Sequence, residues 1–215
     1  MIFSARESFD PVIARSAELL LSQIERFENL LADLLEVSRF DAEVASLSLD
    51  KVDMNALVRR CADDLGLSSK ESDTQFSFDF PDSNIIIDGD PRRIERIMRN
   101  LLANAIDHSE GKPIELTLRA NESAVSVSVR DFGVGLTPQH IERVFDRFWR
   151  ADPSRSRIRG GTGLGLSIAR EDAELHGGGI KVWGEIGRGS NFVLTLPRVY
   201  GETIAVPAIS EIPTA

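Results

Sequence analysis

The chain has 215 residues, of which 42% are hydrophobic and 27% are charged, and its formal net charge is −9. This length and composition predict one ordinary globular domain with an appendage, and the acidic charge argues against general nucleic-acid binding, which needs a basic surface. The single cysteine, Cys61, excludes an intramolecular disulfide, no apolar run approaches the length of a membrane span, and the N-terminus lacks a secretory pattern.

The first forty residues carry a heptad pattern. Its apolar positions are spaced 4-3-4-3-4-3 and comprise Ile13, Ala17, Leu20, Ile24, Phe27, Leu31 and Leu34. Such an a/d seam, about three heptads long, is typical of a coiled coil or helical bundle. Asp10 suits the N-cap and Pro11 the first helical position. Packing against another long helix is favoured over packing on the chain's own domain.

The periodicity fades after Asp41, which predicts a linker over 44–52 and a globular domain over 53–199. "DMNALVRRCADDL" predicts a short helix capped by Asp53, and "TQFSFDF" and "NIIID" predict strands. "DGDPRRIERIMRNLLANAIDH" is a strongly periodic helix, with Asp90 as its cap and Pro91 in its first turn.

The second half of the domain alternates strands, a helix and a hairpin. "IELTLRA" and "AVSVSVRD" predict two strands joined by a turn at 121–123, and "LGLSIAREDAELH" predicts a helix that Gly177 ends. "GIKVWGEI" and "NFVLTLP" predict a hairpin around 187–189, and residues 200–215 a flexible tail. This order predicts an α+β fold, a sheet covered on one face by helices.

Two asparagines stand one turn apart in the periodic helix. Asn100 and Asn104 share one side of it, beside the apolar stripe that includes Leu101 and Ala105. Asparagine is unfavourable inside a helix, but an amide oxygen is a hard, neutral ligand suited to a hydrated Mg²⁺ that also holds phosphates. A capping or buried hydrogen-bonding role is the alternative for either residue.

Two glycine-bearing stretches suit a nucleotide. In "VRDFGVGL", Asp131 ends a strand, where its carboxylate could accept a hydrogen bond from an adenine amine, and Gly133 and Gly135 let a flat ring approach. In "RGGTGLGLSIA", a glycine-rich loop leads into a helix, whose freed amides suit a triphosphate. The latter loop is neither a P-loop nor a dinucleotide fingerprint. An ordinary turn is the alternative for each.

The stretch "ERVFDRFWRADPSRSRIR" lies between these two. Its apolar anchors are Phe145, Phe148 and Trp149, and its arginines make it locally basic in an acidic protein. A mobile, arginine-bearing lid over phosphates is the functional interpretation, and a solvated basic loop is the alternative.

In this order and spacing, the four stretches resemble the N, G1, F and G2 boxes of the sensor histidine kinase catalytic domain, in the Bergerat (GHKL) ATP-binding superfamily. The resemblance covers about 52–198, including the C-terminal hairpin, with Ser190 where threonine is usual. It implies a two-layer α/β sandwich with a mixed, mostly antiparallel sheet, preceded by one long coiled-coil-type helix. "RFENLLADLLEVSRFDAE" and "NAIDHSEGKP" are similar to the MtrB type of sensor kinase.

The resemblance implies a role for each matching residue. Asn104 would coordinate the Mg²⁺ that bridges the phosphates of ATP, and Asn100 and His108 would line the same pocket. Asp131 would read the adenine amine above Gly133 and Gly135, while Arg150 and Arg155 would contact phosphate from the lid. The remaining nucleotide-binding positions by match are Gly161, Thr162, Gly163, Leu164, Gly165 and Ser190.

Two features depart from the family pattern. Asp107 stands where many kinases have lysine or arginine, and we assign it no ligand role. The phosphoacceptor motif is absent, because His108, His140 and His176 all fall in the catalytic region. Residues 1–43 therefore resemble only the second helix of the dimerisation and phosphotransfer domain, and we expect a truncated or engineered chain that begins just past the phosphoacceptor.

The superfamily also contains ATPases of the gyrase, MutL and Hsp90 types, which place a glutamate base one turn before the magnesium asparagine. Asn100 occupies that position here, and an amide cannot take a proton from water. The sequence thus favours a protein-histidine kinase over a hydrolase; a regulatory nucleotide-binding module and a coiled-coil interaction protein are further alternatives.

The kinase interpretation implies several partners. They are ATP, Mg²⁺, a phosphoacceptor helix of the same kinase and a response regulator, within a homodimeric full-length protein. We expect no nucleic-acid partner. The chain is expected to be the cytoplasmic portion of a membrane sensor, reaching the membrane only through upstream segments.

Overall fold

The computed structural model describes residues 46–68, 75–151 and 162–213, together with scattered positions between 16 and 40. The chain forms two compact units, Met1–Val44 and Ala45–Ala215. The described positions of the first unit are helical, which confirms the predicted helix there, and seam residues such as Leu20, Phe27 and Leu34 are exposed. The predicted cap at Asp10 lies outside the described residues. A partner helix for the seam stays a prediction.

The second unit contains the elements that the sequence patterns predict, in the predicted order. Its described helices are α2 (Met54–Ser68), α3 (Pro91–His108), α4 (Pro138–Arg143) and α6 (Gly165–Leu175). Its described strands are β1 (Asp50–Asp53), β2 (Phe76–Asp79), β3 (Ile86–Gly89), β4 (Ile114–Ala120), β5 (Ala124–Asp131), β6 (Gly179–Glu185) and β7 (Gly189–Pro197).

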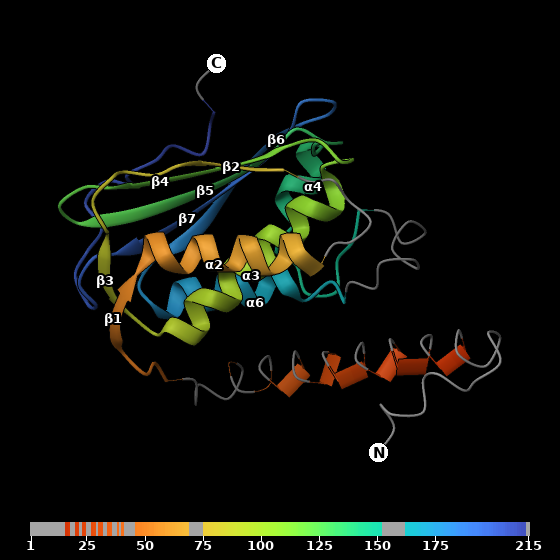
Figure 1. Cartoon of the computed structure of the whole chain (residues 1–215), viewed down its shortest axis with the longest axis horizontal. Coiled ribbons are helices and arrows are strands. Elements are labelled where there is room, and N and C mark those ends of the chain that lie inside the picture. The colour runs from red at the N-terminus through yellow and green to blue at the C-terminus, as the bar shows by residue number, and fades with distance from the viewer. Residues whose placement is uncertain are drawn as a thin grey trace. The chain divides into compact units, whose positions relative to one another are not determined.

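Five of these strands form one mixed sheet in the order β2-β4-β5-β7-β6. β2 pairs in parallel with β4, and the other neighbours pair antiparallel. Helices α2, α3 and α6 lie together on one face of this sheet (Figure 1). The predicted α+β sandwich is therefore confirmed.

The core lies between the sheet and these helices. On β5, Val125, Val127 and Val129 are buried, and on α3 the predicted apolar stripe from Ile94 to Ala105 is buried too. α3 begins as predicted: the Asp90 carboxylate accepts hydrogen bonds from the backbone N–H groups of Arg92 and Arg93, and Pro91 follows it. This cap satisfies two of the helix's unpaired amide donors.

One strand falls in the segment predicted as a linker. β1 pairs antiparallel with β3, Asp50 opposite Gly89 and Asp53 opposite Ile86. β1 has four residues, three of them charged, so it carries no alternation from which a strand could be predicted. Asp53 ends β1 and also caps α2, because its carboxylate accepts a hydrogen bond from the N–H of Ala56.

The C-terminal segment lies on the face of the sheet opposite the helices (Figure 1). The N–H of Ala208 donates to the Ser126 hydroxyl, and the side-chain amides of Asn121 and Asn191 donate to the carbonyls of Val206 and Glu211. Ser126 is consequently buried. Flexibility of residues 200–215 stays a prediction, but these bonds give the segment defined partners, which the sequence pattern did not indicate.

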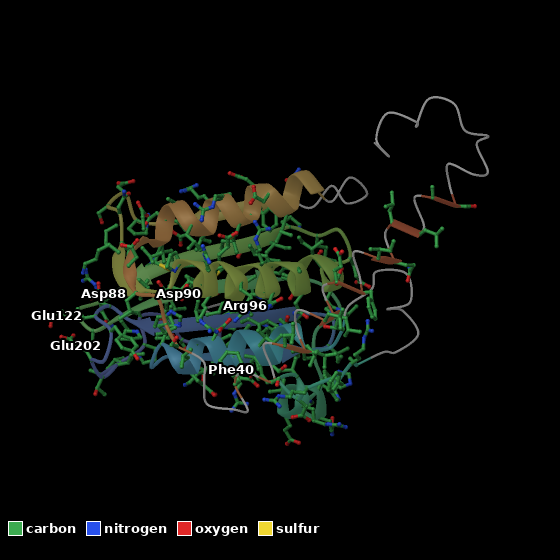
Figure 2. All side chains as sticks on the ribbon, turned by 90° about the horizontal axis from the view of Figure 1, so that it is seen from below. Phe40, Asp88, Asp90, Arg96, Glu122 and Glu202 are labelled. Carbon is green, nitrogen blue, oxygen red and sulfur yellow. The ribbon has the colours of Figure 1, made fainter. Side chains whose placement is uncertain are left out.

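A buried carboxylate joins α3 to α6. Asp172 of α6 is fully buried and pairs with Arg93 Nη1 at 2.8 Å and with Arg96 Nε at 2.7 Å. Figure 2 labels Arg96 and Asp90, which lie along the side of α3 turned to α6. Because a buried charge is tolerated only when it is paired, the two arginines and the aspartate constrain the spacing of the two helices.

His176, just after α6, extends this contact to the start of α3. The N–H of Asp90 donates to its Nε2 at 3.0 Å, and its Nδ1 lies 2.7 Å from the Asp172 carbonyl. Since Nε2 accepts a hydrogen bond, the ring is neutral and Nδ1 carries the proton. Burial lowers the pKa of His176 below its ordinary 6.5.

The neutral His176 predicts a pH-dependent stability. The unfolded chain binds this proton below about pH 6.5 and the folded chain does so only at lower pH, so the free energy of unfolding falls as pH drops from 7.5 to 5.5, by up to about 1.4 kcal/mol per pH unit. Urea unfolding at both pH values measures this. His176→Gln keeps an acceptor for Asp90 without titrating and should flatten the dependence, whereas the control His140→Gln should not. Equal slopes in both variants would contradict the assignment.

Candidate nucleotide-binding site

Asp131 is a buried carboxylate held by its own chain. It ends β5 with 1% of its surface exposed, and Ser190 stands directly opposite on β7. One carboxylate oxygen accepts from the N–H of Gly133 at 2.9 Å, and the other accepts from the Ser190 hydroxyl at 2.5 Å. Each oxygen of an ionised carboxylate accepts about two hydrogen bonds, so a further donor such as an amine can be bound in a fixed direction.

The two glycines after Asp131 are required by the protein's own backbone. A Cβ on Gly133 would lie 1.7 Å from the carbonyl oxygen of His108, and a Cβ on Gly135 would lie 1.9 Å from that of Glu185. Gly135 also has φ +74°. The loop between Asp131 and Gly135 is thereby packed between the end of α3 and the end of β6. The sequence interpretation explained the glycines only by the approach of a flat nucleotide ring and did not include this contact.

Asn100 and Asn104 lie on the partly buried side of α3. Within the part of the chain that the structure describes, neither side-chain amide has a hydrogen-bond partner. The alternative of a structural hydrogen bond therefore finds no support there, and both amides remain able to bind a ligand. A Cβ on Gly165 would lie 2.9 Å from Asn100 Oδ1, so the first residue of α6 abuts this side chain.

α6 begins without a side-chain cap. Its N-cap is Leu164, which is buried, and no side chain of the described residues accepts a hydrogen bond from the first turn. An uncapped helix start presents unpaired N–H groups and the positive end of the helix dipole, which together suit an anion. Thr162 Oγ1 accepts from the N–H of Leu164 at 3.2 Å and orders the approach to the helix.

The approach to α6 is also tied to Phe148, in the first half of the predicted lid. The N–H of Phe148 donates to the carbonyl of Gly163 at 2.9 Å, and a Cβ on Gly163 would lie 2.9 Å from the Phe148 carbonyl carbon. Both residues have positive φ, +64° and +74°. Nothing in the sequence pattern indicated this pairing, because a positive φ at phenylalanine has no residue-type signature.

The structure thus joins α3 to the two other predicted stretches of the site, the start of α6 and the loop after Asp131. Asn100 contacts the start of α6, and two turns later the carbonyl of His108 contacts the loop after Asp131, while the His108 side chain is exposed. Arg150 is partly exposed and has no ion pair among the described residues. Arg155 and Gly161 lie outside the described residues.

The site's donors fit a magnesium ion that is shared with substrate phosphates. Among the described residues no three His, Cys, Asp or Glu side chains gather as a metal cluster. An amide oxygen without a partner, such as that of Asn104, is a hard ligand that supplies one position to a largely hydrated Mg²⁺.

A membrane-spanning helix is absent from the described part of the chain, where every helix is too short or too polar to span a bilayer.

Residues 89–200, more than half of the chain, match the family model described as "Histidine kinase-, DNA gyrase B-, and HSP90-like ATPase". The chain belongs to this family. The matched segment runs from the end of β3 through β7 and contains the two asparagines, Asp131 and the α6 helix start. The resemblance stated from the four sequence boxes is confirmed at the level of family and fold.

The chain is also similar to named sensor kinases. It is 49% identical over 204 residues to the sensor histidine kinase MtrB of Mycobacterium leprae, which covers 95% of this chain and 36% of that protein. Full-length ShkA, solved in complex with AMPPNP, has a TM-score of 0.76 at 27% identity, over 91% of this chain and 41% of ShkA. The catalytic domain of the histidine kinase ThkA has a TM-score of 0.62 at 25% identity, and the match covers 71% of this chain and 99% of the ThkA domain. The chain therefore spans about a third of the length of the MtrB protein it matches.

The crowding at Gly133 predicts a large stability difference between two glycine positions. Gly133→Ala drives a Cβ into a backbone carbonyl and should cost about 3 kcal/mol in the free energy of unfolding. The control is Gly179→Ala, because a Cβ there meets nothing within 4 Å and should change stability by about 0.5 kcal/mol or less. Chemical denaturation of both variants measures the difference, and equal stabilities would contradict the crowding argument.

Proposed function

We propose that this chain is the ATP-binding catalytic portion of a two-component sensor histidine kinase. It binds Mg–ATP and transfers the γ-phosphoryl group to a histidine on a dimerisation helix, for relay to an aspartate of a response regulator. The observation that carries the proposal is the pair of amides, Asn100 and Asn104, one turn apart on α3 and without hydrogen-bond partners among the described residues, with Asn100 against the uncapped start of α6. Family membership and the similarity to named sensor histidine kinases support it.

Each part of the nucleotide has a matching group in the site. The Asp131 carboxylate, fixed by Gly133 and Ser190, accepts a hydrogen bond from the adenine amine. The N–H groups at the start of α6 and the loop over 161–165 bind the phosphates. Asn104 holds the Mg²⁺, which when bound neutralises the phosphate charge, and Arg150 and Arg155 contact the phosphates from the lid.

The site favours transfer to a histidine over hydrolysis. Phosphoryl transfer needs little covalent chemistry from the protein beyond positioning and neutralising charge. Hydrolysis would gain from a base that takes a proton from water, and Asn100 offers an amide at the position next to the phosphates. A neutral imidazole is itself the nucleophile, so a histidine acceptor needs no such base.

The partners follow from this reaction. The phosphoacceptor helix, the response regulator and a second copy of the full-length protein, which forms a homodimer, are the proposed macromolecular partners. The chain would work as the cytoplasmic portion of a sensor kinase. The similarity to MtrB supports these assignments, although it covers 36% of that protein.

Nucleotide binding should depend on Mg²⁺ through Asn104. Removing its amide oxygen with Asn104→Ala should weaken fluorescent-ATP binding in Mg²⁺ roughly tenfold or more, because about 1.4 kcal/mol of ligation is worth a factor of ten. The matched control Gln75→Ala removes an exposed amide just before β2 and should bind as the wild type does. A wild-type chain that fails to bind ATP in Mg²⁺ would contradict the proposed function.

Phosphoryl transfer should occur only in trans. When this chain is mixed with radiolabelled ATP and a separate helical hairpin that carries the phosphoacceptor histidine, acid-labile phosphate should accumulate on the hairpin. The chain incubated alone should stay unlabelled, because its three histidines lie in the catalytic unit. Acid-labile phosphate on the chain alone, or phosphate release faster than labelling of the hairpin, would contradict the proposal.

A further inference from the structure

The guanidinium of Arg130 lies between two aromatic rings. Its Cζ is 4.7 Å from the ring centroid of Phe132 and 4.9 Å from that of Trp183 on β6. Arg130 precedes Asp131 on β5, and because successive side chains of a strand point to opposite faces, it lies on the other face of the sheet from the Asp131 carboxylate. Stacking on two rings restricts the direction of the planar guanidinium.

From this position Arg130 bridges two backbone segments. Its Nη1 donates to the carbonyl of Asp131 at 2.9 Å, and its Nη2 donates to the carbonyl of Arg188 at 2.6 Å. Arg188 belongs to the turn that joins β6 to β7. One side chain therefore ties the end of β5 to that turn, with a fork geometry that no other side chain supplies.

The strand that follows this turn carries the hydroxyl that holds Asp131. Gly189 follows Arg188, has φ +84°, and a Cβ on it would lie 2.0 Å from the Asp131 carbonyl oxygen. Ser190 comes next and donates to the Asp131 carboxylate. The backbone of this turn thus approaches Asp131 closely, and a small shift of the turn would move the Ser190 hydroxyl away from the carboxylate.

The placement of Arg130 is electrostatically costly. Burial lowers the pKa of its guanidinium, the charges of Asp131 and Glu115 act against that shift, and Arg188 adds to it. Surface arginines without a structural role are normally exposed to solvent, as Arg188 is, whereas Arg130 is partly buried. The two carbonyl bonds and the two rings offset this desolvation together with the charges of Asp131 and Glu115.

We propose that Arg130 is a positioning residue for adenine recognition: by tying the Asp131 carbonyl to the β6–β7 turn, it holds the Asp131 carboxylate and the Ser190 hydroxyl in the geometry that selects a purine bearing an exocyclic amine. The proposal rests on the proposed function, in which Asp131 reads that amine. Arg130 does not touch the nucleotide, and its effect passes through the backbone of Asp131 and the turn.

The test compares ATP with purine riboside triphosphate, which differs from ATP only by lacking the amine. The wild type should bind ATP about tenfold to a hundredfold more tightly than this analogue in Mg²⁺, the range expected for a hydrogen bond to a charged group. In Arg130→Leu the affinity for ATP should fall roughly tenfold while the affinity for the analogue stays within about twofold. A merely structural role would lower both affinities together.

Three further variants sharpen the result. Arg119→Leu, on the neighbouring strand β4 where the arginine pairs with Asp79, is the matched control and should keep the full preference for ATP. Arg130→Lys keeps the charge but replaces the planar, ring-stacked guanidinium by a single ammonium nitrogen, without the two separated nitrogens that reach the two carbonyls. It should therefore behave like Arg130→Leu, and it also serves if the leucine variant does not fold. In an Asp131→Asn background, Arg130→Leu should cause no further loss of preference.

The outcomes separate the two proposals. If Arg130→Leu lowers both affinities equally, changes neither, or is fully rescued by Arg130→Lys, the positioning role is overturned while adenine reading by Asp131 stands. If the wild type itself shows no preference for ATP over the analogue, the reading of adenine by Asp131 fails, whatever Arg130 does.

Discussion

The packing of α3 against α6 through Asp172 is the constraint on which the site depends. Asp172 is fully buried and is neutralised by Arg93 and Arg96, so moving the helices apart would leave a buried charge unpaired. α3 carries Asn100 and Asn104, and α6 supplies the uncapped helix start that abuts Asn100. The Asn100 amide and the start of α6, the two groups to which we assign the triphosphate, thus come from different elements at a spacing held by ion pairs outside the candidate site.

Close backbone contacts play the same part at the Asp131 end of the candidate site. At Gly133 and Gly135, carbonyl groups of α3 and β6 occupy the space that a Cβ atom would need. The loop after Asp131 therefore has little room to shift. The carboxylate then needs only Gly133 and Ser190 to fix its direction. Preorganisation of this kind lowers the entropy lost on binding, because the groups are ordered before the nucleotide arrives. The contacts that make these glycines necessary for the fold therefore also fix the loop to which we assign adenine recognition.

The face of the sheet opposite the helices is also structured. The C-terminal segment bonds to Ser126, Asn121 and Asn191, and nearer the site Arg130 stacks between Phe132 and Trp183. Polar side chains on β5 and β7 are buried there because the chain's own end covers them. The Asp131 end of the candidate site is thus supported from both faces of the sheet.

Much of this protein could be predicted from its sequence, because the decisive patterns are local. The 3.6-residue period of α3, its Asp90-Pro91 start and the alternation of β4 and β5 each predict an element from neighbouring residues. The order of the four stretches, one with asparagines, two rich in glycine and one rich in arginine, indicated the family. Tertiary structure alone decided which groups meet. Three hydrogen bonds illustrate this, those of His176 with Asp90, of Arg130 with the β6–β7 turn and of Phe148 with Gly163. They join residues far apart in the chain, and the last also depends on positive φ angles. Distance along the chain and backbone angles leave no periodic pattern in a sequence. Local propensity sets the elements, whereas burial, charge pairing and backbone crowding set the site.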